Sequence, residues 1–124
     1  MERKDQIRMG KLTTHILDTA AGVPGGNIRI VVTRLEPDHQ LVADVVSNGD
    51  GRTDSPILDG SAFTAGVYQL EFHVGEYYKN RGLSLPEPAF LDIVTLRVGL
   101  ADASQNYHVP LLVSPFGYST YRGS

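Results

Sequence analysis

Apolar and polar residues alternate along much of this chain with a period of two, the period of a β-strand that buries one face. The clearest run is 67–74 (VYQLEFHV), in which every second residue from Tyr68 to Val74 is apolar. Other segments rich in β-branched and apolar residues are also predicted to be strands: 11–18, 27–36, 41–47, 89–99, 107–113 and a short one near 118–122. The pattern therefore predicts a protein built mainly of β-sheet.

Turn-forming residues separate these segments in four places, which read AAGVPGG, EPDHQ, SNGDGR and SPFG. In the third, Asn48–Gly51 can adopt positive φ angles and is predicted to form a tight reversal between two strands. One helix is predicted over Gly75–Arg81, too short to be stable unless it packs on a sheet. Short strands with a turn about every eight to twelve residues are typical of an antiparallel β-sandwich, here of roughly seven to eight strands.

The segment 89–99 (AFLDIVTLRVG) carries apolar residues at both odd and even positions. An antiparallel strand normally exposes one polar face, so apolar residues on both faces indicate that the outer face is covered as well. We therefore expect another subunit to pack against this strand.

Composition and charge narrow the class of protein. A chain of 124 residues forms one domain, which we place at residues 11–124 after a charged leader at 1–10. The formal net charge is −3 and no basic cluster with interleaved aromatics occurs, so nucleic acid is not an expected partner. The leader lacks the apolar run of a signal peptide, and no stretch reaches the ~20 apolar residues of a membrane span. We expect a cytoplasmic protein with no membrane partner.

Three residues could carry chemistry: His15 in the first predicted strand, His108 in the last long one, and Arg52 beside the Asn-Gly-Asp-Gly turn. An imidazole transfers protons near neutral pH, and an arginine offers a planar fork of donors to carbonyl or carboxylate groups. Taken one by one, each residue is more simply interpreted as an ordinary surface residue. The two histidines could begin a zinc site, but no third ligand is evident, so no metal is expected.

The segment 107–124 (YHVPLLVSPFGYSTYRGS) differs from an ordinary chain terminus, which is usually small, polar and poorly ordered. Here an alternating strand and a Pro-Phe-Gly turn precede two tyrosines, an arginine and a final serine. These residues favour a C-terminal tail that is held against the fold and takes part in the function of the protein. The simpler alternative is a short edge strand with Arg122 lying over apolar surface.

Three segments of the chain resemble the transthyretin-like 5-hydroxyisourate hydrolases of purine degradation: LTTHILDTAAGVPGGNIRI, NGDGRTD and YHVPLLVSPFGYSTYRGS. The resemblance extends from Leu12 to Ser124, and the YRGS terminus separates these hydrolases from the hormone-carrying transthyretins. It implies a transthyretin-like β-sandwich. The chain departs from the family pattern before its sixth strand, where members commonly carry an aromatic-rich segment with a Phe/Tyr-Pro pair. This chain instead reads LSLPEPAFLDIVTLRVGL from Leu83 to Leu100.

The resemblance also implies an activity, the hydrolysis of the ring amide of 5-hydroxyisourate to 2-oxo-4-hydroxy-4-carboxy-5-ureidoimidazoline in urate degradation, without a cofactor. The residues implied to be catalytic are His15, Arg52 and His108. Those implied to line the same pocket are Tyr121, Arg122, Gly123 and Ser124. Family members are homotetramers, dimers of dimers, whose sites draw on more than one chain. Which histidine is the general base stays open, and extending the C-terminus is expected to impair activity.

Two alternatives belong to other functional classes. A transthyretin-like carrier would bind a small ligand without converting it, but it has no use for the two histidines, Arg52 and YRGS together. An immunoglobulin-like structural module usually occurs in tandem, and secreted forms carry a disulfide, whereas this chain has no cysteine. The hydrolase is therefore the favoured interpretation.

Overall fold

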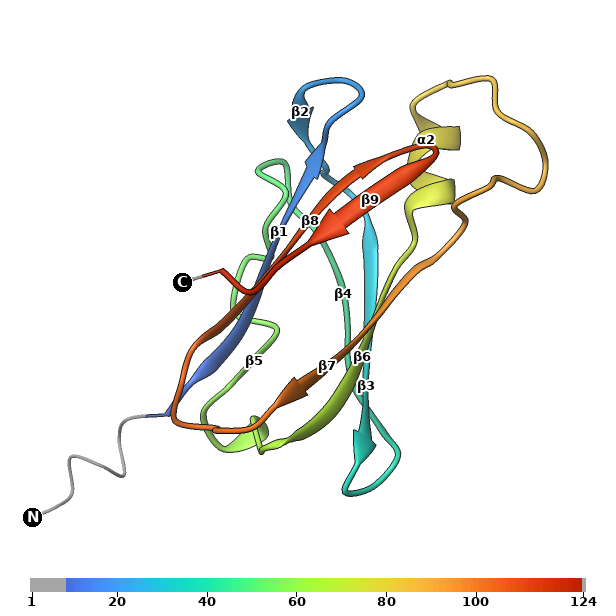
Figure 1. Cartoon of the computed structure of the whole chain (residues 1–124). Coiled ribbons are helices and arrows are strands. Elements are labelled where there is room, and N and C mark those ends of the chain that lie inside the picture. Colours follow the sequence, from blue (N-terminus) through green and yellow to red (C-terminus); the bar gives the residue numbers. More distant parts are fainter. Residues whose placement is uncertain (1–8, 124) are drawn as a thin grey trace, which may run out of the picture.

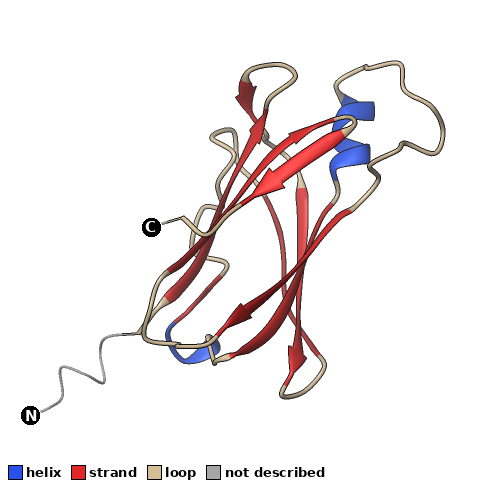
Figure 2. Cartoon of the chain, viewed as in Figure 1, coloured by secondary structure: helices blue, strands red, loops and turns tan. Residues whose placement is uncertain are grey.

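Two β-sheets packed face to face make up the molecule, with strands forming both layers (Figure 1 and Figure 2). The computed structural model describes residues 9–123, so most of the predicted leader and the candidate residue Ser124 lie outside the described residues. Within this range there are nine strands, one α-helix and one 3₁₀ turn. The predicted β-sandwich with a short helix is confirmed.

The first sheet has the strand order β2-β1-β8-β9, and β5 pairs with the beginning of β1. Its strands are β1 (Lys11–Asp18), β2 (Val23–Pro24), β5 (Leu58–Asp59), β8 (Tyr107–Ser114) and β9 (Gly117–Thr120). The second sheet has the order β4-β3-β6-β7. Its strands are β3 (Arg29–Glu36), β4 (Gln40–Val46), β6 (Gly66–Phe72) and β7 (Val94–Leu100). The 3₁₀ turn η1 (Gly60–Ala62) precedes β6, and the helix α2 (Val74–Asn80) follows it.

The core lies between the two sheets and takes the alternate residues that the pattern marked as apolar. Tyr68, Leu70 and Phe72 of β6 are fully buried, as predicted. Full burial of an apolar side chain such as that of Leu70 contributes about 1.5–3 kcal/mol to the free energy of unfolding. Other core residues come from both sheets, the helix and the loop before β5, and include Ile30, Val32, Ile57, Val74, Tyr78, Leu96, Val109 and Leu111. The need to bury one face sets the register of these strands.

Strand β1 shows what this register means for the outer surface. Leu12 and Ile16 are fully buried in the core. Because successive side chains of a strand point to opposite faces, Lys11, Thr13 and His15 lie on the outer face of the sheet, and none of the three is fully buried. From Lys11 to His15 the outer face of β1 therefore carries polar residues that are at least partly accessible.

Strands β1 and β8 run parallel, whereas the other strand pairs within residues 9–123 are antiparallel. In this register Thr13 lies opposite His108, and His15 lies opposite Pro110. The alternation of apolar residues says nothing of strand direction, so this pairing was not foreseen. It brings together outer-face residues that lie 95 positions apart in the sequence.

Strand β1 ends at Asp18, a buried carboxylate that anchors the helix. Its oxygens accept hydrogen bonds from the hydroxyls of Tyr77 (2.7 Å) and Tyr78 (2.9 Å) and from the amides of Ala20 (3.1 Å) and Ala21 (3.2 Å). Burial and the hydrogen bond to Asp18 raise the pKa of Tyr77 to about 12, so this hydroxyl keeps its proton. These contacts hold a seven-residue helix that would be marginal alone.

Residues 9–123 contain no helix of the length and hydropathy that a membrane crossing needs.

The strand predicted over 89–99 is shorter than expected, because β7 begins at Val94. Its partner β6 ends at Phe72, opposite Val94, where the chain turns into α2, so the ladder stops there. The Asp92 carbonyl instead accepts a hydrogen bond from the Gly75 amide at 2.9 Å. Phe90 lies in this loop with 71% of its surface exposed. The apolar residues before Val94 therefore belong to a loop and not to a second face of the strand.

The Asn-Gly-Asp-Gly segment forms the predicted tight turn between two strands, but these two strands do not pair with each other. The Gly51 amide donates to the Asn48 carbonyl at 2.9 Å, and the Asn48 amide donates to the Arg52 carbonyl at 2.7 Å. Gly51 has a φ of 78°. The turn lies in the connection from β4, in the second sheet, to β5, in the first. This crossing carries Arg52 to β1.

Candidate active site

The outer face of the first sheet brings Thr13 and His108 into contact. They are opposite each other in the β1–β8 register, and Oγ1 of Thr13 lies 2.9 Å from Nδ1 of His108. This hydrogen bond orients the half-buried imidazole and leaves Nε2 as the ring nitrogen for another partner.

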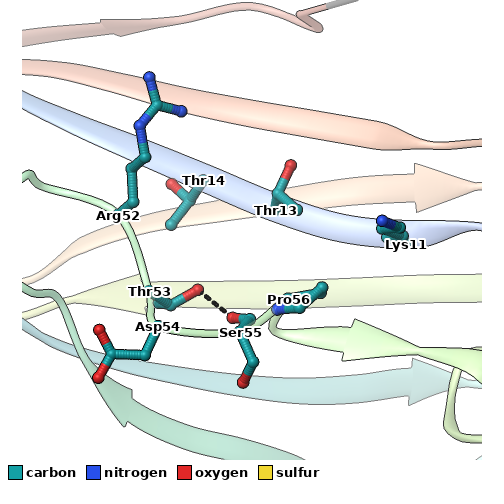
Figure 3. Close-up of a pocket in the computed structure, with 8 residues that line it drawn as sticks. All are labelled: Lys11, Thr13, Thr14, Arg52, Thr53, Asp54, Ser55 and Pro56. Atoms are coloured by element: carbon teal, nitrogen blue, oxygen red, sulfur yellow. Dashed lines mark hydrogen bonds between the residues drawn. The ribbon is translucent and has the colours of Figure 1, made fainter.

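The turn at 48–52 is attached to β1 and positions Arg52 beside this pair. The side-chain oxygen of Asn48 accepts hydrogen bonds from the amides of Asp50 (2.9 Å) and Arg52 (3.2 Å). The Gly51 carbonyl accepts from the Ile16 amide of β1 at 2.8 Å. A side chain at Gly51 would collide with the Ile16 carbonyl oxygen, so the positive φ and the close approach both require glycine. Figure 3 shows the Arg52 side chain extending from this loop past β1.

His15 interacts with the same turn. Its Nε2 lies 3.1 Å from the Asp50 carbonyl oxygen. Because a carbonyl oxygen can only accept, Nε2 carries the proton in this contact, and Nδ1 is the acceptor in the neutral ring. The Asp50 carboxylate in turn accepts a hydrogen bond from Nε of Arg52 at 3.2 Å. Asp50 therefore links His15 to Arg52 through its backbone and its side chain.

The charge state of His108 depends on these neighbours. Burial lowers its pKa below the ordinary value of 6.5, and the charge of the Arg52 guanidinium and the neighbouring His15 lower it further. At neutral pH His108 is thus an uncharged imidazole that can accept a proton. The three residues predicted to be catalytic lie close enough to influence one another electrostatically.

Two shallow hollows flank this group and share Lys11, Thr13 and Arg52. The first has a volume of about 260 Å³ and is completed by Asn106 and His108. The second, of about 250 Å³, extends along the loop after the turn (Figure 3). The residues that complete it are Thr14, Thr53, Asp54, Ser55 and Pro56. Both hollows are small and lined mainly by polar and charged residues.

The predicted tail residues divide between two places in the single chain. Gly123 pairs with His108, and its amide donates to the His108 carbonyl at 2.7 Å. The Arg122 guanidinium lies 4.2 Å from the centre of the Tyr107 ring and donates to the Asn106 carbonyl at 3.1 Å. Tyr121 and Arg122 line a separate hollow of about 460 Å³ with Tyr107. Within one chain, therefore, only Gly123 of the described tail residues contacts the candidate catalytic group.

Metal ligation has little support in this geometry. Within residues 9–123, no group of three histidine, cysteine, aspartate or glutamate side chains is close enough to hold a metal ion. The two candidate histidines instead use a ring nitrogen each on protein atoms, His15 on the Asp50 carbonyl and His108 on Thr13.

Lys11, Thr13 and Asn106 were not among the predicted site residues, yet they line the hollow beside His108. The signal for two of them was present in the sequence. Lys11 and Thr13 lie four and two residues before His15 and so share its face of the strand. Asn106 depends on the parallel pairing of β1 with β8, which the sequence pattern does not reveal.

Comparisons with known proteins agree with this architecture. A model of the HIUase/Transthyretin family matches residues 12–123. A relative from Ralstonia nicotianae, named 5-hydroxyisourate hydrolase, is 57% identical over 117 residues, which cover 94% of this chain and 100% of the relative. The solved structure of Klebsiella pneumoniae 5-hydroxyisourate hydrolase matches with a TM-score of 0.78 and 28% identity, covering 94% of this chain and 100% of that one. A structure of (S)-allantoin synthase matches with a TM-score of 0.90 and 45% identity, covering 94% of this chain and 44% of that one.

Proposed function

The chain belongs to the HIUase/Transthyretin family, and from that premise we propose that it hydrolyses the ring amide of 5-hydroxyisourate with His15, Arg52 and His108. Relatives up to 57% identical are named 5-hydroxyisourate hydrolase, so this sandwich is an enzyme of that kind and not a ligand carrier. The observation that supports the assignment of the site is that three separate elements bring these residues together. His15 comes from β1, Arg52 from the turn that follows β4, and His108 from β8.

Opening a ring amide requires a nucleophilic water, a stabilised oxyanion and a proton for the departing nitrogen. The water oxygen bonds to the carbonyl carbon and the C–N bond breaks. The nitrogen takes one proton, a carboxylate remains, and the second proton of the water is released. His108 accepts the first proton from water, because its pKa is low enough to keep the ring neutral and Nδ1 is already bonded to Thr13. Such a proton transfer contributes ~10²–10⁴-fold to the rate.

His15 and Arg52 support this step. Arg52 lines the hollow together with His108, and His15 is joined to Arg52 through Asp50. Arg52 binds the amide carbonyl oxygen and stabilises the negative charge that develops on it, a role whose loss typically costs ~10²–10³-fold in rate. Its Nε is held by Asp50, so the guanidinium is oriented before substrate binds. His15, fixed through Nε2 by the Asp50 carbonyl, uses Nδ1 to orient the water or to return a proton to the nitrogen.

Assembly into a homotetramer, a dimer of dimers, is part of the proposal. The candidate site lies on the outer face of a sheet and is shallow, so a second chain would close it and exclude water. Tyr121, which is 61% exposed, together with Arg122, Gly123 and Ser124 would complete the pocket in that assembly. Light scattering of the purified protein should give four times the chain mass.

A cytoplasmic location, expected from the sequence, also belongs to this proposal and can be tested by cell fractionation.

The experiment generates 5-hydroxyisourate in situ from urate with a urate oxidase and follows its disappearance by absorbance. The protein should accelerate the decay, and His108→Ala and Arg52→Ala should each lose most of the acceleration. His39→Ala is a matched control, because His39 is an exposed histidine in the loop between β3 and β4. Binding of 5-hydroxyisourate without accelerated decay would identify a carrier and refute the proposed activity.

A further inference from the structure

Lys11 is a second cation in the candidate site, which neither the sequence motifs nor the mechanism above uses. It lines both hollows, and in each it is accompanied by Thr13 and Arg52. Figure 3 shows Lys11, Thr13 and Arg52 along the same stretch of β1 and the adjacent loop.

The position of Lys11 is fixed by the sheet. It is the first residue of β1, where the strand pairs with Asp59 of β5 on one side and with β8 on the other. Two residues of strand, roughly 6.6 Å, separate its backbone from that of Thr13, which holds His108. A flexible four-carbon stem lets the ammonium group reach the space next to the imidazole.

The distribution of charge distinguishes the two hollows. Asp54 lines the second hollow, and its carboxylate is a counter-charge there. The hollow that contains His108 is lined by two cations, Lys11 and Arg52, and by no carboxylate of residues 9–123. The Asp50 carboxylate, which pairs with Arg52 at 3.2 Å, lies outside this lining. A hollow of this kind favours a ligand that carries or develops negative charge.

We propose that Lys11 binds the carboxylate formed when the ring amide opens and is a substrate-positioning residue of this enzyme. The inference rests on the proposed function, because the reaction itself creates that charge. Water supplies one oxygen of the carboxylate and the former amide carbonyl supplies the other, while the ring nitrogen leaves with a proton. Arg52 holds the original carbonyl oxygen, and Lys11 stabilises the charge as it spreads to the second oxygen.

The test compares Lys11→Met and Lys11→Arg in the 5-hydroxyisourate decay assay at low and high salt. Lys11→Met should lower kcat/KM about tenfold and should flatten its dependence on ionic strength, because the screened cation is gone. Lys11→Arg should restore most of the rate. Lys79→Met is the matched control, since Lys79 lies on α2 and pairs with Glu87 at 3.8 Å, and it should behave as the unmodified protein.

The outcomes separate this inference from the proposed function. If the unmodified protein accelerates decay and Lys11→Met matches it in kcat/KM and in salt dependence, the role of Lys11 is refuted and the hydrolase stands. A lower rate in Lys11→Met without restoration in Lys11→Arg also refutes a charge-based role. If the unmodified protein itself does not accelerate decay, the proposed function fails and the role of Lys11 fails with it.

Discussion

Replacing Gly123 by alanine would press a methyl group into the ring of His108. A Cβ built at Gly123 lies 2.6 Å from Cδ2 of His108 and 3.2 Å from its Cβ and Cγ. Non-bonded carbon atoms rest at about 3.5–4.0 Å, so either the imidazole or residue 123 must move by about 1 Å. The tail contacts the candidate catalytic histidine at this position, and only glycine fits there without displacement.

The expected effect is large on catalysis and small on stability. A displacement of about 1 Å in a catalytic group costs ~10²-fold in rate, so kcat/KM should fall by about that factor. Gly123 follows the last strand and contributes one isolated bridge to the sheet. The free energy of unfolding should therefore change by less than about 1 kcal/mol.

The assay is the decay of 5-hydroxyisourate, with urea unfolding of the same preparations measured in parallel. Gly117→Ala is the matched control in the β8–β9 hairpin, because the nearest atom to a Cβ there, Oγ of Ser114, is 3.8 Å away. Gly117→Ala should keep nearly full activity. Unchanged kcat/KM in folded Gly123→Ala would show that the contact between the tail and His108 is irrelevant to catalysis.

Other variants test other contacts. In an NMR titration the pKa of His108 should lie below 6.5. Arg52→Gln should raise this pKa, because a nearby positive charge is removed. An unchanged pKa in the variant would contradict the electrostatic argument. Thr13→Val should lower kcat/KM about two- to tenfold by removing one hydrogen bond, whereas Thr13→Ser, which keeps the hydroxyl, should restore it. Asp18→Ala should lower the free energy of unfolding by about 3 kcal/mol, since four donors lose their buried acceptor. Asp44→Ala, at an exposed ion pair with Arg29, should barely change urea unfolding, and equal losses in the two variants would refute the anchoring role of Asp18.

The sequence predicted the strands best where one face of a strand is buried and the other is not. The alternation in β6 placed Tyr68 and Leu70 in the core. In β1 the same alternation buries Leu12 and Ile16 and leaves His15 on the outer face. This success follows from the two-residue period of the side chains and needs no knowledge of the rest of the fold.

The parts that the sequence could not predict depend on distant segments. The start of β7 at Val94 is set by the end of its partner β6, which lies some twenty residues earlier in the chain. The turn before Arg52 was recognised, but its attachment to Ile16 depends on a connection that crosses between the sheets. The candidate catalytic residues were named from a family resemblance, because each of them alone looked like an ordinary surface residue.

The pairing of β1 with β8 has a consequence for how the protein is made. Thr13 and His108, which touch in the folded chain, are 95 residues apart, so a ribosome releases β1 long before it releases the strand that completes the sheet. Until then one edge of β1 exposes backbone groups that can pair with other chains, an aggregation hazard during synthesis. Such long-range pairing also slows folding. Nascent chains that stop before β8 would lack His108, so catalytic competence would arise only after β8 has been synthesised.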